Sequence, residues 1–120
     1  MKTKTKREII IETSKAYTTG NRSVVGLSCA YKDPDGNKCA VGRCLEDNSH
    51  FFQEQNNCKS IVLFGDKLET ELKEEYRGHC IEFWQQLQRL HDGSVYWSYA
   101  GITKKGEEYV GILIDTWGEK

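Results

Sequence analysis

The sequence predicts a small α+β domain in which a β-hairpin, or a three-stranded antiparallel sheet, packs with three to four helices. Two observations favour this fold class. The turn motif Asp33-Pro34-Asp35-Gly36 joins two short segments that favour extended structure, and other segments carry apolar residues at helical spacing. A chain of 120 residues with 38% hydrophobic residues can bury one ordinary core. We therefore expect residues 1–120 to form a single domain.

The first helix is expected over residues 6–17. Thr5 and Glu8 have the spacing of a capping box, in which each side chain accepts a hydrogen bond from the other's backbone N–H. Gly20 stands where a left-handed residue would end the helix. One helical face, which we expect to be buried, collects Ile9, Ile10, Thr13, Ala16 and Tyr17.

The segment CAYKDPDGNKCAVGRCL is the most informative part of the chain, because it combines three of the five cysteines with a turn motif and a run of small residues. We predict a β-hairpin with arms at residues 27–31 and 38–44. Pro34 presets the first turn torsion, and Gly36 suits the position that follows a type I turn.

The segment 45–59 shows no clear periodicity. We expect a long loop there, with a helical turn near Phe51 and Phe52. The apolar run at residues 60–65 ends in glycine, which predicts a third, buried strand.

A second helix is expected to start at Asp66, which has the spacing of a capping box with Glu69, and to end at Gly78. Its apolar face would hold Leu68, Leu72 and Tyr76.

The strongest helical pattern lies in GHCIEFWQQLQRLHDG, and Gly93 follows it as a cap. Its apolar face, which we expect in the core, consists of Cys80, Phe83, Trp84, Leu87, Leu90 and His91.

The C-terminal segment 95–117 leaves two alternatives. Residues 95–102 and 109–115 could pair as a hairpin, or Thr103 could cap a last helix with apolar residues at helical spacing. We favour the helix.

Charge and hydropathy limit the classes of partner. Lys and Arg number 17 against 18 for Asp and Glu, so a net charge of -1 gives no field that would attract nucleic acid or a membrane surface. The apolar run Ile9-Ile10-Ile11 is too short for a signal peptide or a membrane span. We expect a cytoplasmic protein that binds neither membrane nor nucleic acid.

The cysteines are expected to be reduced. Cys29, Cys39, Cys44 and Cys58 could in principle bind zinc together with histidines, but no Cys-x-x-Cys pair is present. Free cysteines are usually small buried hydrophobic residues, and we favour that role. We predict no metal and no cofactor; the spacing does not support zinc, but the number of cysteines and histidines leaves zinc open.

Aromatic and basic residues suggest a nucleotide pocket. Guanidinium and ammonium groups bind phosphates, and aromatic rings stack on bases. We expect Arg43, Lys38 and Arg89 to bind phosphates and Tyr31 or Trp97 to stack on a base. The alternative is that the rings are core anchors and the charges only solvate the surface.

Two further features would complete this pocket. His91 lies in the apolar stripe of its helix, so it is either a buried histidine bonded to a backbone carbonyl or to Asp92, or a ligand contact. We expect His91 and Asp92 to orient ribose hydroxyls. The small residues Ala40, Val41 and Gly42 would let a backbone or a ligand approach closely, and this arm should lie against the end of the His91 helix.

These motifs resemble a group of small, mostly uncharacterised proteins encoded by tailed bacteriophages. The shared pattern consists of Cys-x-Tyr at Cys29 and Tyr31, a Lys-Cys-Ala-hydrophobic-Gly run at residues 38–42, and Leu-Gln-x-x-His-Asp at residues 87–92. The tail AGITKKGEEYVGIL is similar to the closing helix of the group. The resemblance implies a phage accessory protein in a bacterial cytoplasm, and it brings no catalytic residues with it.

We therefore expect a counter-defence protein that binds and sequesters a host nucleotide-type immune signal, a cyclic nucleotide or an ADP-ribose derivative, without turnover. A chain this small encloses a nucleotide most readily between subunits, so we expect a homo-oligomer. One alternative is an inhibitor of a host defence or metabolic enzyme, anchored by Phe51, Phe52 and Trp117. The other is an enzyme that degrades the signal using His91 or His79.

Overall fold

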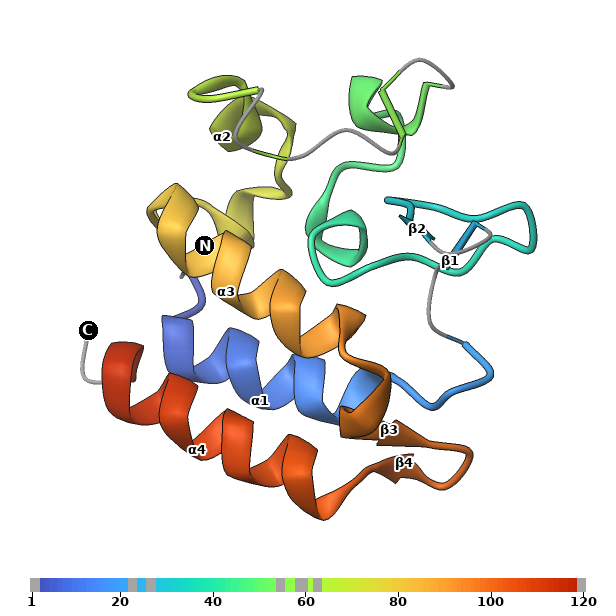
Figure 1. Cartoon of the computed structure of the whole chain (residues 1–120). Coiled ribbons are helices and arrows are strands. Elements are labelled where there is room, and N and C mark those ends of the chain that lie inside the picture. The colour runs from blue at the N-terminus through green and yellow to red at the C-terminus, as the bar shows by residue number, and fades with distance from the viewer. Residues whose placement is uncertain are drawn as a thin grey trace.

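The computed structural model describes residues 3–21, 24–25, 28–53, 56–57, 61 and 64–118. Three helices, α1 (Lys6–Ala16), α3 (Ile81–Asp92) and α4 (Lys104–Trp117), lie side by side and form one half of the molecule (Figure 1). Each of the three helices contacts the other two, and α4 runs antiparallel to both α1 and α3 (Figure 1). The other half consists of turns, short helices and a small hairpin.

The strands are short and form two separate hairpins in the described part of the chain. Strand β1 (Val24–Val25) pairs antiparallel with β2 (Ser28–Cys29), and β3 (Trp97–Ser98) pairs in the same way with β4 (Gly101–Ile102). The predicted α+β class is confirmed.

Helix α1 begins as the sequence predicts. The Thr5 hydroxyl accepts from the Glu8 N–H at 3.1 Å, and the Glu8 carboxylate accepts from the Thr5 N–H at 2.9 Å. The helix ends at Ala16, and the prediction that Gly20 ends it in a left-handed conformation is wrong. Instead, the extended residue Tyr17 follows the helix, and the Asn21 amide donates to the Ala16 carbonyl at 3.1 Å.

The predicted turn is confirmed, but the second arm of its hairpin is not a strand. The Asp33 carboxylate accepts from the N–H groups of Asp35 and Asn37, and Gly36 has a φ of 88°. After the single bridge between Lys32 and Lys38, the chain turns and forms the 3₁₀ helix η1 (Gly42–Cys44). Strand β2 pairs with β1 instead of with this arm.

The arm leaves the hairpin after Cys39, whose N–H still makes a hairpin bond to the Tyr31 carbonyl at 3.2 Å. Beyond it, the Val41 N–H donates to the Gln88 side chain of α3 at 3.3 Å instead of to a neighbouring strand. The Arg43 N–H donates to the Cys39 carbonyl in a helical pattern. The bond between Val41 and Gln88 holds the arm against the helical half of the molecule.

The middle of the chain is a loop that contains the 3₁₀ helix η2 (His50–Phe52), as predicted. Half of the third strand predicted at residues 60–65 lies outside the described residues. Ile61, Phe64 and Gly65 are described, and none of them belongs to a strand.

The second predicted helix is shorter than expected. Helix α2 (Lys67–Glu71) ends where Leu72 becomes extended and bridges to Leu45, and the 3₁₀ helix η4 (Glu74–Tyr76) follows. The predicted capping box is wrong, because the Asp66 side chain caps nothing and the Glu69 carboxylate accepts from the Gly78 N–H at 2.8 Å instead.

The third and fourth predicted helices are confirmed. In α3, the buried residues are Phe83, Trp84, Leu87, Leu90 and His91, whereas Cys80, which we placed on the apolar face, is exposed. Gly93 follows α3 without a left-handed conformation, and the 3₁₀ helix η5 (Ser94–Tyr96) leads into β3. The Thr103 hydroxyl accepts from the Gly106 N–H at 3.1 Å and so caps α4, which excludes the hairpin at residues 109–115.

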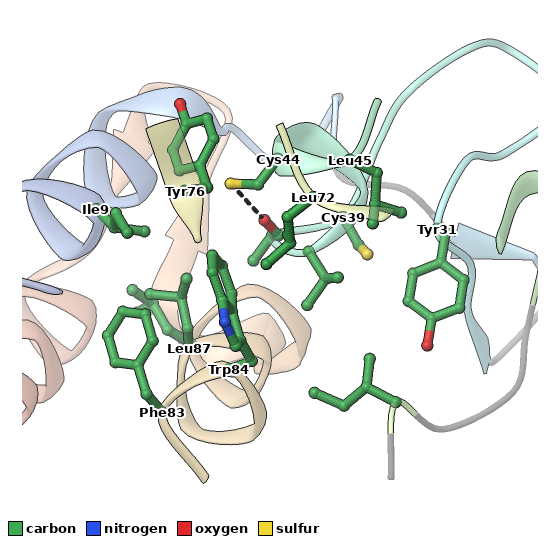
Figure 2. Close-up of a cluster of buried hydrophobic side chains, with 14 of the residues drawn as sticks. Ile9, Tyr31, Cys39, Cys44, Leu45, Leu72, Tyr76, Phe83, Trp84 and Leu87 are labelled. Atoms are coloured by element: carbon green, nitrogen blue, oxygen red, sulfur yellow. Dashed lines mark hydrogen bonds between the residues drawn. The ribbon is translucent and has the colours of Figure 1, made fainter. Parts of the chain in front are cut away.

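The core lies where the helical half meets the loop half. Figure 2 shows Trp84 and Leu87 of α3 close to Ile9 of α1, with Leu72 and Cys44 of the loop half beside them. All five of these residues are fully buried. The side chain that links the two halves most directly is therefore the large Trp84 ring.

Candidate functional site

Arg43, one of the predicted phosphate-binding residues, is held by the protein itself. Its guanidinium donates to the Glu12 carboxylate at 3.0 Å and to the Thr13 hydroxyl at 3.1 Å. The Tyr76 hydroxyl donates to the same carboxylate at 2.8 Å, and Lys4 pairs with it as well. In this structure Arg43 thus joins η1 to α1 as a structural ion pair.

The Glu12 carboxylate is the centre of this network. Burial would raise its pKa, but hydrogen bonds from Lys4, Tyr76 and Arg43 outweigh burial and hold the pKa below its usual range. The carboxylate is therefore ionised at neutral pH and connects the chain before α1 with η1 and η4.

The two predicted stacking rings are buried. Tyr31 is packed against Phe51 and Phe64, with ring centroids at 5.3 and 6.2 Å. Trp97 is only 4% exposed, and its indole N–H donates to the Leu90 carbonyl at 2.8 Å. Neither ring has an open face in this structure.

The remaining predicted cations lie on different elements. The Lys38 ammonium lies 3.8 Å from the Asp47 carboxylate and 5.3 Å from the centre of the Phe52 ring. Arg89 is exposed on α3. Among the described residues, no hydrogen bond or ion pair joins either cation to another member of the predicted pocket.

His91 and Asp92 adopt the arrangement of the first alternative, in which a buried histidine is bonded to Asp92. His91 is completely buried, with its Nδ1 atom 2.9 Å from the Asp92 carboxylate. The Gln88 amide group donates to Asp92 at 3.0 Å, while its oxygen accepts from the Val41 N–H. The expected contact between the small-residue arm and this end of α3 is thereby confirmed.

The small-residue arm accommodates a backbone. A Cβ atom at Gly42 would lie 2.0 Å from the Tyr31 carbonyl oxygen, so only glycine fits without a shift. The sequence left open whether a backbone or a ligand approaches this arm, and at Gly42 the structure shows a backbone, that of Tyr31.

The described cysteines behave as packing residues or surface thiols. Cys39 and Cys44 are fully buried, and burial raises the pKa of the Cys44 thiol to about 12. Figure 2 shows both among aliphatic side chains, with Cys44 bonded to a backbone carbonyl. No cluster of three metal-ligating side chains occurs in the described ranges, while the Cys29 side chain and Cys58 lie outside them.

A second site, which the sequence did not predict, is a surface hollow of about 690 Å³ between η2 and α2. It combines a histidine, a carboxylate, an ammonium group, aromatic rings and polar side chains. The lining residues are His50, Phe51, Gln53, Asn56, Phe64, Lys67, Thr70 and Glu71.

The Glu71 carboxylate organises one wall of this hollow. It accepts from the Ser49 hydroxyl at 2.8 Å and from the His50 backbone N–H at 2.6 Å, and the His50 Nδ1 atom lies 3.3 Å from both of its oxygens. Burial would raise the pKa of Glu71, but these hydrogen bonds from Ser49 and His50 keep it below its usual range. Glu71 is thus a fixed anion that orients the His50 ring.

The hollow is also lined by two aromatic rings and an ammonium group. The Phe51 and Phe64 rings stack with their centroids 4.0 Å apart and an angle of 24° between their planes. Phe51 is buried and Phe64 is half-buried, so Phe64 is the ring nearer to solvent. Lys67 is exposed and has no ion-pair partner among the described residues.

The sequence contains little that would predict this site. Its only signal was the expected helical turn near Phe51, which η2 confirms. His50 and Glu71 lie 21 positions apart and meet only because Leu72 bridges to Leu45 and brings α2 beside the loop.

The anchors expected for a protein inhibitor are not exposed. Phe51 is buried, while Phe52 and Trp117 are partly buried against the core. The large apolar side chains that are exposed in the described chain are Val95, Tyr99 and Ile112.

No protein-family model matches the chain, and no curated protein and no solved structure is significantly similar to it. None of the described helices is both long and apolar enough to cross a bilayer.

Proposed function

We propose that the protein is a binding protein that captures a nucleotide-type ligand, without turnover, in the hollow between η2 and α2. The observation that carries this proposal is the grouping of an aromatic pair, an exposed ammonium group and an oriented imidazole around one hollow. A base can pack against Phe64, and Lys67 can neutralise a phosphate.

The proposed site differs from the one expected from the sequence. Arg43 is engaged by Glu12, and Tyr31 and Trp97 are buried, so these residues serve the fold in this conformation. In the hollow, residues of η2 and α2 and the preceding turn residue Phe64 would supply the same chemistry instead.

In biological terms, the proposal is a phage counter-defence protein that sequesters a host immune signal in the bacterial cytoplasm. The resemblance to tailed-phage proteins supports this context, and the signal would be a cyclic nucleotide or an ADP-ribose derivative. A second subunit would cover the hollow on its solvent side, so we propose a homo-oligomer.

Capture and heat release test the proposal. Purified protein is incubated with bacterial extracts that contain such signals, washed, heated, and the released material is identified by mass spectrometry. We expect an intact nucleotide-type compound from wild-type protein, little from Lys67→Ala, and a wild-type amount from Lys104→Ala, which changes an exposed lysine on α4. A failure to recover any such compound contradicts the proposal, and a converted product would favour the degrading enzyme instead.

A second candidate function is protein inhibition. Tyr99 is 82% exposed at the turn between β3 and β4, which is unusual for a large aromatic side chain and is typical of interface anchors. A stoichiometric host partner that is lost with Tyr99→Ser, together with no thermal shift by nucleotides, would favour this candidate.

A further inference from the structure

The further inference rests on the proposed function and concerns the sugar of the ligand. It starts from the protonation of His50. An ionised carboxylate can only accept hydrogen bonds, and the Glu71 carboxylate faces the Nδ1 atom of the imidazole from both oxygens. The proton of a neutral His50 ring must therefore sit on Nδ1, which leaves a lone pair on Nε2.

The Nε2 atom is the part of the ring that a ligand can reach. The His50 side chain is 73% exposed, whereas the Glu71 side chain is 17% exposed and accepts a hydrogen bond from the Ser49 hydroxyl. No described residue makes a hydrogen bond to His50 Nε2, and His50 lines the hollow. The structure thus presents a hydrogen-bond acceptor in a fixed orientation at the ligand site.

The other polar groups of the hollow restrict what this acceptor can bind. Ionised phosphate oxygens only accept hydrogen bonds, so a neutral imidazole lone pair cannot hold them, and Lys67 is the group suited to phosphate. A ribose hydroxyl, by contrast, is a donor that matches the Nε2 lone pair.

We propose that the hollow selects ribonucleotides, because His50 Nε2 accepts a hydrogen bond from a ribose hydroxyl of the bound ligand. A site built to bond a hydroxyl rejects an analogue that lacks it, since the site's own polar group is then desolvated without a partner. For one partly exposed acceptor we expect a preference of about tenfold.

Paired nucleotide probes test this selectivity. The probes are AMP, GMP, CMP and UMP, each compared with its 2′,3′-dideoxy counterpart by isothermal titration calorimetry at about pH 8. We expect wild-type protein to bind at least one ribonucleotide about tenfold more tightly than its dideoxy counterpart. His50→Phe should reduce this preference to less than about twofold, by weakening the ribonucleotide only.

The outcomes separate the inference from the proposed function. If wild-type protein binds both members of every pair within about twofold, while Lys67→Ala still weakens both, the ribose selectivity is wrong and the binding function stands. If none of the probes binds wild-type protein, the ribose selectivity is refuted, and recovery of a nucleotide-type compound in the capture experiment then decides whether the proposed function stands without it. A preference that survives in His50→Phe also refutes the role of Nε2.

Discussion

Replacement of Gly42 by alanine should destabilise the fold, because the backbone of Tyr31 occupies the space that the alanine side chain would need. A Cβ atom at this position would lie 2.0 Å from the Tyr31 carbonyl oxygen and 2.9 Å from its carbonyl carbon. Both atoms belong to the backbone, which cannot rotate away as a flexible side chain would. Either η1 or the segment at Tyr31 must therefore move.

The expected cost combines overpacking with a weakened hydrogen bond. One additional carbon in a packed interior costs about 1–3 kcal/mol. The movement also stretches the bond from the Cys39 N–H to the Tyr31 carbonyl, which contributes about 0.5–1.5 kcal/mol. We expect a total loss of about 2–4 kcal/mol and a fall in Tm on the order of 10 °C.

Urea and thermal unfolding followed by circular dichroism would measure this loss. Gly111→Ala is the matched control, because Gly111 lies on the exposed side of α4 and a Cβ there meets nothing within 4 Å. This control should gain about 0.5–1 kcal/mol, since alanine favours a helix over glycine. A Gly42→Ala variant as stable as wild type would refute the steric argument.

Three further changes probe the interior. Arg43→Met should lower the free energy of unfolding by about 2–3 kcal/mol, because it removes one of the two cations that pair with the partly buried Glu12 carboxylate and leaves only Lys4; an unchanged urea midpoint would contradict this role. The pKa of Glu12 is lowered in the fold, so its stabilisation is complete above the pKa of the unfolded chain and is lost as pH falls through the folded pKa. Glu12→Gln should therefore flatten the decrease in stability below about pH 5, and an identical pH profile would argue against it. Iodoacetamide should modify Cys80 in the native protein and reach Cys39 and Cys44 only after unfolding, as peptide mapping by mass spectrometry can show; equal rates would contradict their burial.

The helices that the sequence predicted best are those with local signals at their ends. Thr5 with Glu8 and Thr103 with Gly106 make short-range bonds that depend on nothing outside their own turns. The apolar stripe of α3 was equally clear, and it failed only at Cys80, which stands at the cap position before the first turn.

The hairpin prediction failed because its second arm depends on distant partners. Arg43 bonds to Glu12, which lies 31 positions earlier, and Val41 bonds to Gln88, which lies 47 positions later. Local propensity favours a strand there, but these tertiary contacts outweigh it. The same contacts hold the Arg43 side chain in a partly buried position against α1.

The hollow was not predictable for a related reason. His50 belongs to a 3₁₀ helix and Glu71 to a helix of five residues. Neither helix is long enough to show a clear periodicity of apolar residues in the sequence. The pair forms only after the bridge between Leu45 and Leu72 has brought the two segments together.

The contact between α1 and α4 joins two segments that lie far apart in the sequence (Figure 1). A long intervening loop must close before such a contact can form, and folds that depend on distant contacts form more slowly than folds built from neighbouring segments. Ile9 and Ile10 of α1 are fully buried in the finished fold. Their side chains stay exposed to water for as long as α1 is unpacked, so this helix is the segment at which slow folding would favour aggregation.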